Sequence, residues 1–100
     1  MILNGKTLSA FKEWLKINYP DKTYGWFTGL PDSAKYGVYV DFFDSVGIYV
    51  MDLHNEISRT FYYDISTKPM SDDITSDHIF TRHEARTKAI EKAVEIYNQQ

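Results

Sequence analysis

The sequence predicts an α+β fold, a four-stranded antiparallel β-meander with an N-terminal and a C-terminal helix packed on one face (α-β-β-β-β-α). Three observations predict this class. Apolar residues recur at helical spacing near both ends of the chain. Between those segments, runs rich in aromatic and β-branched residues alternate with polar residues. Short turns separate the runs, and sequential strands joined in this way form an antiparallel meander. The length of 100 residues predicts a single domain over residues 1–100.

The first predicted element is a helix that begins at a Thr7 cap and ends near Asn18. A threonine side chain can accept a hydrogen bond from a backbone N–H of the first helical turn, which makes it a good cap. Pro20 ends the helix, because the residue before a proline is disfavoured in the helical conformation. The apolar stripe of this helix consists of Leu8, Phe11, Trp14 and Leu15, and Ile17 widens it.

Four strands are predicted in the middle of the chain, where aromatic and β-branched residues dominate. Only Asp44 and Ser45 separate the second strand from the third, which predicts a tight hairpin. A turn at residues 54–56 follows the third strand, and a polar loop over residues 66–77 follows the fourth. The four predicted strands cover residues 23–28, 36–43, 46–53 and 57–65.

The last predicted element is a helix that begins after Thr81. Thr81 and Glu84 fit the capping box, in which each of the two side chains satisfies a backbone N–H at the start of the helix. Apolar residues follow at helical spacing, which predicts that one side of this helix is buried. They are Ala85, Ala89, Ile90, Ala93, Val94, Ile96 and Tyr97.

The two faces of the predicted sheet differ in composition. One face carries aliphatic side chains such as Val40, Ile48 and Val50, which are expected beneath the helices. The opposite face is rich in tyrosine and methionine, residue types that are enriched where proteins meet. Its members are Tyr39, Asp41, Phe43, Tyr49, Met51 and Leu53, joined by Thr60, Tyr62 and Asp64 of the fourth strand.

Two interpretations of this second face remain open. The face is either a recognition surface for a protein partner, or a second core layer covered by the first strand or by residues 66–80. The protein partner would be a host protein or a second copy of the chain in a homodimer. The residues predicted to contact a partner are Tyr39, Asp41, Phe43, Tyr49, Met51, Tyr62, Asp72 and Asp73.

Charge is unevenly distributed along the chain. The net charge is −3, but residues 21–80 alone carry ten acidic and four basic residues. This acidic middle would repel a phosphate backbone, which disfavours nucleic-acid binding there. A loop with Asp72, Asp73 and Asp77 could imitate a row of phosphates and occupy a basic groove. A solvated loop is the simpler interpretation of the same three residues.

No residue pattern in the chain predicts catalysis. No serine lies in a nucleophile elbow, and the glycines do not form a phosphate-binding loop. Asp52, His54 and Glu56 alternate and could bind a metal ion, and Asp41 with Asp64 could form an acid–base pair. A solvated turn and surface carboxylates are the simpler interpretations. We therefore expect no catalytic residue, no metal and no cofactor.

The composition predicts a cytoplasmic protein. The chain has no cysteine, so disulfides and thiolate metal sites cannot form, which is typical of reducing compartments. The first residues are too few and too polar for a signal peptide. No apolar run reaches the roughly 18 residues of a transmembrane helix, so we expect no membrane span.

Two segments resemble parts of small uncharacterised proteins encoded by bacteriophages and mobile elements of gut bacteria. They are residues 8–15 (LSAFKEWL) and residues 81–93 (TRHEARTKAIEKA). The resemblance implies an intracellular accessory protein that acts by binding inside an infected or element-bearing bacterium. Many proteins of that size and origin act by binding, including proteins that block host defence nucleases. The resemblance implies no site residue, because the group has no assigned site.

Together these features predict a small non-enzymatic intracellular binding protein. With the resemblance, the expected activity is inhibition of a host or defence protein, in the manner of an anti-CRISPR protein. The tyrosine-rich face, the acidic loop or both would make the contact. One alternative is a self-associating structural module, and a further alternative is a small enzyme or metal-binding protein.

Overall fold

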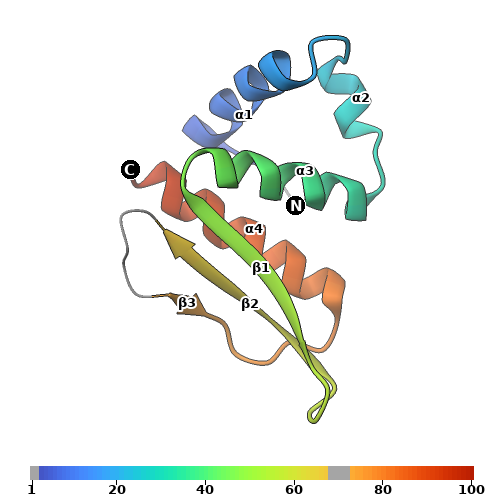
Figure 1. The fold of residues 1–100 in the computed structure, drawn as a ribbon, viewed down its shortest axis with the longest axis vertical. Coiled ribbons are helices and arrows are strands. Elements are labelled where there is room, and N and C mark those ends of the chain that lie inside the picture. Colours follow the sequence, from blue (N-terminus) through green and yellow to red (C-terminus); the bar gives the residue numbers. More distant parts are fainter. Residues whose placement is uncertain (1–2, 68–72) are drawn as a thin grey trace.

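The computed structural model describes residues 3–67 and 73–100 of the chain. The structure is α+β, with helices at both ends and an antiparallel sheet (Figure 1), which confirms the predicted class. The order of elements in the described residues is α-α-α-β-β-β-α, which differs from the predicted order. The elements are α1 (Gly5–Asn18), α2 (Tyr24–Thr28), α3 (Asp32–Ser45), β1 (Ile48–Asn55), β2 (Thr60–Thr67), β3 (Ile74–Thr75) and α4 (Arg82–Asn98).

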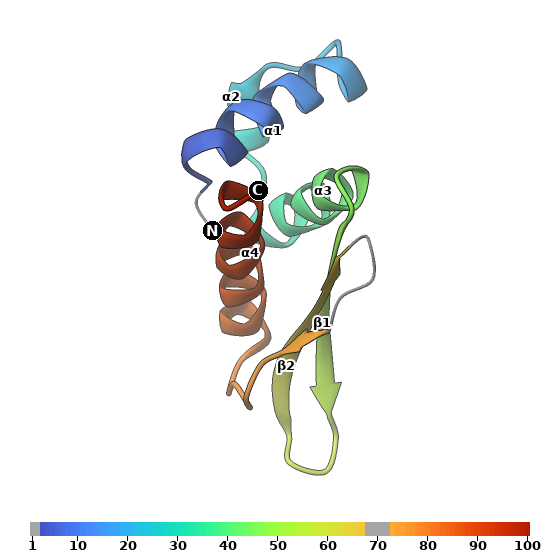
Figure 2. The same cartoon turned by 90° about the vertical axis from the view of Figure 1, so that its left-hand side faces the viewer.

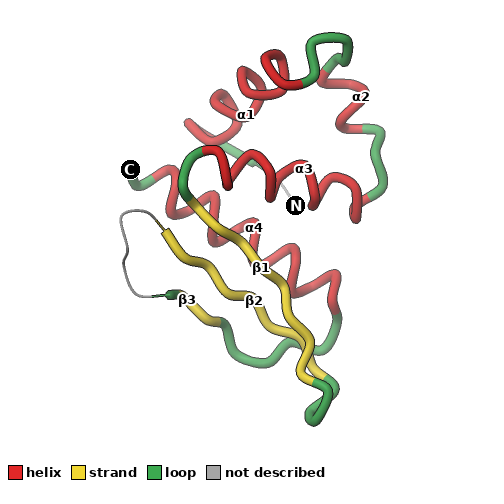
Figure 3. Tube along the Cα trace, viewed as in Figure 1, coloured by secondary structure: helices red, strands yellow, loops and turns green. Residues whose placement is uncertain are grey.

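Two of the four predicted strands are helices in the structure (Figure 3). The strand predicted over residues 23–28 is wrong, because Thr23 caps the short helix α2. Its Oγ1 accepts a hydrogen bond from the backbone N–H of Trp26 at 3.2 Å. The strand predicted over residues 36–43 is also wrong, because this segment lies inside α3.

Helix α3 forms because its aromatic residues recur at helical spacing. Tyr36, Tyr39, Phe42 and Phe43 lie on one side of the helix, and all four are buried. The valines of the same segment alternate as in a strand. Burial of four aromatic rings removes more apolar surface from water than burial of the valines would, so the helical period prevails.

The hairpin predicted at Asp44 and Ser45 is not formed. Both residues lie in the last turn of α3, where Ser45 Oγ donates a hydrogen bond to the carbonyl oxygen of Phe42 at 2.6 Å. Gly47 then adopts a φ of 80°, a conformation that glycine reaches without steric cost. The chain turns there into β1, and the described residues form three strands instead of four.

The sheet has the strand order β1-β2-β3, and both neighbouring pairs are antiparallel. In the turn between β1 and β2, Asn55 Oδ1 accepts hydrogen bonds from the backbone N–H groups of Ile57 (3.0 Å) and Ser58 (3.2 Å). This turn delays β2, which begins three residues later than predicted, at Thr60. The two-residue strand β3 lies in a segment that was expected to be loop.

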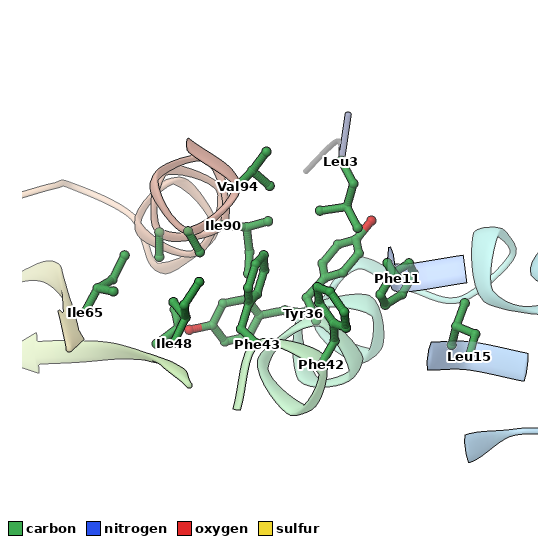
Figure 4. Packing of buried hydrophobic residues seen from close by; sticks show 14 of the residues in the cluster. Leu3, Phe11, Leu15, Tyr36, Phe42, Phe43, Ile48, Ile65, Ile90 and Val94 are labelled. Atoms are coloured by element: carbon green, nitrogen blue, oxygen red, sulfur yellow. The ribbon is translucent and has the colours of Figure 1, made fainter. Parts of the chain in front are cut away.

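Helix α4 covers one face of the sheet (Figure 2). Its buried side packs in one cluster with Ile48, Val50 and Ile65 of the sheet (Figure 4). Thr81 Oγ1 accepts a hydrogen bond from the backbone N–H of Glu84 at 3.1 Å, which confirms the predicted cap. The buried residues of α4 are Ala85, Ala89, Ile90, Ala93 and Val94, as predicted, and the predicted Ile96 and Tyr97 are half-buried.

Aromatic rings join α1, α2 and α3. Phe11 of α1 is fully buried. Its ring centroid lies 4.8 Å from that of Phe27, 5.1 Å from that of Tyr39 and 5.4 Å from that of Phe42. The prediction that the N-terminal helix packs on a face of the sheet is therefore wrong, because α1 packs on α2 and α3, beyond the end of the sheet (Figure 2).

Hydrogen bonds join the start of α1 to the end of α4. Thr7 is not the cap of α1, because the helix begins after Asn4 and Thr7 is fully buried within it. Thr7 donates two hydrogen bonds to Asn98 Oδ1, from Oγ1 at 2.7 Å and from its backbone N–H at 3.1 Å. Asn98 Nδ2 in turn donates to Asn4 Oδ1 at 2.8 Å. These bonds fix the two helices against each other.

Candidate functional site

One face of the sheet is covered by α4, and no described helix covers the other face (Figure 2). Successive side chains of a strand point to opposite faces, and paired residues of antiparallel strands point to the same face. The register therefore assigns Ile48, Val50 and Ile65, which are buried, to the face beneath α4. We call the opposite surface the open face; it comprises Tyr49, Met51 and Leu53 of β1 with Tyr62 and Asp64 of β2.

Met51 lies at the centre of the open face and is 54% exposed. Asp64 is its cross-strand partner. The carboxylate of Asp64 is held in place, because its Oδ1 accepts a hydrogen bond from Thr75 Oγ1 of β3 at 3.0 Å. Tyr49 precedes Met51 on β1, and Tyr62 precedes Asp64 on β2. The open face thus combines an exposed thioether, two tyrosines and one oriented carboxylate.

The structure brings together only part of the predicted binding face. Tyr49, Met51 and Tyr62 share the open face. The prediction is wrong for Tyr39 and Phe43, which are 4% and 0% exposed because they belong to the buried side of α3. Burial raises the pKa of Tyr39 to about 12, so its hydroxyl stays neutral in the core.

Carboxylates occupy the segments that adjoin the open face. Asp41 and Asp44 are exposed near the end of α3, which leads into β1, and Asp73 is exposed directly before β3. Partial burial, and then the neighbouring Asp41, raise the pKa of Asp44. Asp72, which was also predicted to contact a partner, lies outside the described residues. Of these carboxylates, Asp64 lies on the open face itself, and Asp41, Asp44 and Asp73 lie on segments that come directly before β1 and β3 in the sequence.

A polar cluster that the sequence did not predict lies on the covered side of the sheet. Arg86 Nε of α4 is 3.4 Å from Asp52 Oδ2 of β1, and the Arg86 guanidinium carbon is 4.8 Å from the ring centre of Tyr36 of α3. Burial, followed by the charge of Asp52, raises the pKa of Tyr36 well above its usual range. Arg86 lies at the centre of the apolar side of α4. A charged residue at such a position indicates a buried polar contact, and this signal could have predicted the cluster.

The alternating residues Asp52, His54 and Glu56 do not assemble as a metal site. Asp52 pairs with Arg86, and the His54 ring stacks on Phe61 with 4.8 Å between ring centroids. Within residues 3–67 and 73–100, no group of three histidine, aspartate or glutamate side chains is placed to hold a metal ion.

The acid–base pair considered for Asp41 and Asp64 is also not formed by the sheet. Asp41 lies on α3, and the cross-strand partner of Asp64 is Met51.

Among the helices of the described chain, none is long and apolar enough to cross a membrane.

Comparison of the chain with protein-family models, curated proteins and solved structures gives no match. The fold and the site define a small α+β protein in which one helix supports an antiparallel sheet, and no described helix covers the far face of that sheet. The geometry and charge of the open face are therefore the basis for assigning a function.

Proposed function

We propose that the protein is a non-enzymatic binding protein that contacts another protein through the open face. The observation that carries the proposal is the exposure of Met51 between Tyr49 and Tyr62 on a sheet face that no described helix covers. Methionine adapts its shape to a partner, and tyrosine supplies a large contact area with a polar tip. The paired strands already fix the backbone that carries these side chains, which limits the conformational entropy lost on binding.

The partner that fits this surface carries basic groups around an apolar patch. Asp64 lies on the open face, and Asp41, Asp44 and Asp73 lie on adjoining segments. Opposite charges at the rim of an interface accelerate association and disfavour wrong partners. Two copies of the open face would bring these carboxylates together, so a different protein is favoured over a homodimer through this surface.

The resemblance of residues 8–15 and 81–93 to phage and mobile-element proteins supports a bacterial setting for this interaction. We place the protein in the cytoplasm of the host bacterium, where its partner would be a host protein or a defence protein. Proteins that bind nucleic acid present basic surfaces to the phosphate backbone. A carboxylate-flanked apolar face has the charge needed to bind and block such a surface.

Site-specific cross-linking tests this proposal, because the chain has no cysteine of its own. Met51→Cys, labelled on the thiol with a photo-cross-linker, should capture a protein from the native host cell, and unlabelled wild-type protein should compete with the capture. Ile17→Cys is the matched control, since Ile17 is 77% exposed on α1, away from the sheet. A protein captured equally from both positions would contradict the proposal.

The affinity of the purified captured protein gives the quantitative test. Met51→Asp and Tyr62→Ala should each weaken binding by roughly 1–3 kcal/mol, whereas Ile17→Asp should leave it unchanged. Unchanged affinity in both open-face variants would exclude this face as the interface. Sedimentation of the wild-type protein distinguishes a self-associating module from a protein that binds a different partner. If the wild type is a dimer, Met51→Asp shows whether the open face forms the dimer contact, because it should then sediment as a monomer.

A further inference from the structure

A cavity of about 450 Å³ lies between α1 and the segment that leads into α2. These helices are at the end of the molecule far from the turn between β1 and β2 (Figure 1). Leu15 and Tyr24 form its apolar wall. None of the lining residues belongs to the open face, so the cavity is separate from the proposed protein-binding surface. The polar lining consists of Ser9, Lys12, Glu13, Lys16, Lys22 and Thr23.

The cavity is positively charged. Three lysine residues line it together with one acidic residue, Glu13, whose carboxylate pairs with Lys16 at 3.3 Å. In the part of the chain that the structure describes, neither Lys12 nor Lys22 forms an ion pair with a carboxylate. The whole chain has a net charge of −3, so this local excess of positive charge does not follow from composition.

Aromatic rings hold the two lysines that lack a carboxylate partner. Lys12 Nζ is 4.8 Å from the ring centre of Tyr24, and Lys22 Nζ is 5.6 Å from the ring centre of Trp26. A cation–π contact orients an ammonium group without neutralising its charge. Lys12 and Lys22 are therefore positioned at the cavity with their charge still available to a ligand.

Hydroxyl groups add further hydrogen-bond donors to the lining. Thr23 Oγ1 accepts a hydrogen bond from the backbone N–H of Trp26, so the hydroxyl hydrogen of Thr23 can be donated elsewhere. Ser9 is exposed and brings a second hydroxyl. A lining of ammonium and hydroxyl groups, in which the one carboxylate is already paired, suits a ligand that carries acceptors and negative charge.

We propose that this cavity binds a small molecule that carries one or more phosphate groups. Phosphate supplies several acceptor oxygens and more than one negative charge, and lysine is a common phosphate ligand that acts as a point charge. The volume falls in the range of small-molecule sites, roughly 300–1,000 Å³. That space accommodates phosphate beside the lysines and an organic group against Leu15 and Tyr24.

Titration with inorganic pyrophosphate and with ATP, followed by backbone amide NMR shifts of the full chain, tests the proposal. Both probes should shift the amides of Lys12, Lys22 and Tyr24, and adenosine, which lacks phosphate, should not. The Lys12→Gln/Lys22→Gln double variant should weaken binding about tenfold or more. The Lys88→Gln/Lys92→Gln double variant removes the same charge from α4 and should bind as the wild type does.

The two probes distinguish the sources of the phosphate. Tighter binding of ATP would support a phosphorylated organic ligand, and equal binding would support recognition of the phosphates alone. No shift at the cavity with either probe would overturn the proposal, as would equal losses of affinity in the two double variants. These variants leave the open face intact, so this result and that of the cross-linking experiment are independent.

Discussion

Arg86 of α4 and Asp52 of β1 form an ion pair with 3.4 Å between Nε and Oδ2, and their side chains are only 25% and 13% exposed. Arg86 also lies over the ring of Tyr36 of α3. Removal of one member of a mostly buried ion pair leaves the other without its partner, which costs more than the loss of an exposed pair. This contact therefore joins the closing helix to the sheet and to α3.

Arg86→Met is expected to lower the free energy of unfolding by about 1–3 kcal/mol, because the Asp52 carboxylate would lose its partner while mostly buried. Urea unfolding followed by fluorescence measures the change. Lys92→Met is the control, because Lys92 forms a more exposed ion pair with Glu95 at 3.1 Å. Exposed ion pairs contribute only about 0–1 kcal/mol to the free energy of unfolding. Equal losses in the two variants would contradict the role of burial.

Phe11→Ala is expected to lower the free energy of unfolding by about 3–5 kcal/mol, because it leaves a cavity beside the buried rings of α2 and α3. That loss is a large part of the stability of a small domain. Phe11→Leu should therefore be measured alongside it and should give a smaller loss in a folded protein. Ile17→Ala, on the exposed side of the same helix, should change stability by less than about 0.5 kcal/mol. Equal losses of stability for Phe11→Leu and Ile17→Ala in thermal unfolding would contradict this prediction.

Thr7→Val is expected to destabilise the fold by about 0.5–1.5 kcal/mol, because valine keeps the volume and removes the hydroxyl that donates to Asn98. A double-mutant cycle with Asn98→Ala isolates this contact. The coupling between the two substitutions should be about 0.5 kcal/mol or more, since the residues are hydrogen-bonded. If the two losses simply added in urea unfolding, the hydrogen bond between the Thr7 hydroxyl and Asn98 would contribute no free energy of its own.

The buried hydroxyl of Tyr39 makes the free energy of unfolding depend on pH in the alkaline range. Burial raises its pKa from 10.0 to about 12. Between these values the unfolded chain loses the proton and the folded protein keeps it, so the free energy of unfolding falls as pH rises. The contribution is complete below pH 10 and is lost as the pH approaches 12.

Urea unfolding on both sides of pH 10 measures this dependence. Tyr39→Phe removes the ionisable hydroxyl and should lose less stability than the wild type as the pH rises. An equal decrease in both proteins would mean that the Tyr39 hydroxyl is not the group responsible.

The closing helix could be predicted because local and tertiary signals agree there. Thr81 is a favourable cap, and the apolar period that follows it matches the side that is buried. Helix α3 could not be predicted, because valines at every second residue and aromatic residues at every third or fourth share one segment. The choice between the two periods depends on rings of α1 and α2, such as Phe11 and Phe27, which lie outside the α3 segment.

The open face could be predicted in part. The alternation of β1 correctly separates Ile48 from Tyr49 and Met51, since a half-buried strand has a period of two. Tyr39 was misplaced together with α3. The short strand β3 has no local signal and depends on pairing with Asp64 and its neighbour in β2.

The position of α4 in the chain has a consequence for protein synthesis. The ribosome makes this helix after every element on which it packs, so the sheet face with Ile48 and Ile65 is bare while α4 is still being translated. Thr7 likewise meets Asn98 only after a further 91 residues have been added. The nascent chain therefore exposes this apolar surface until α4 has left the exit tunnel, and the core closes only then.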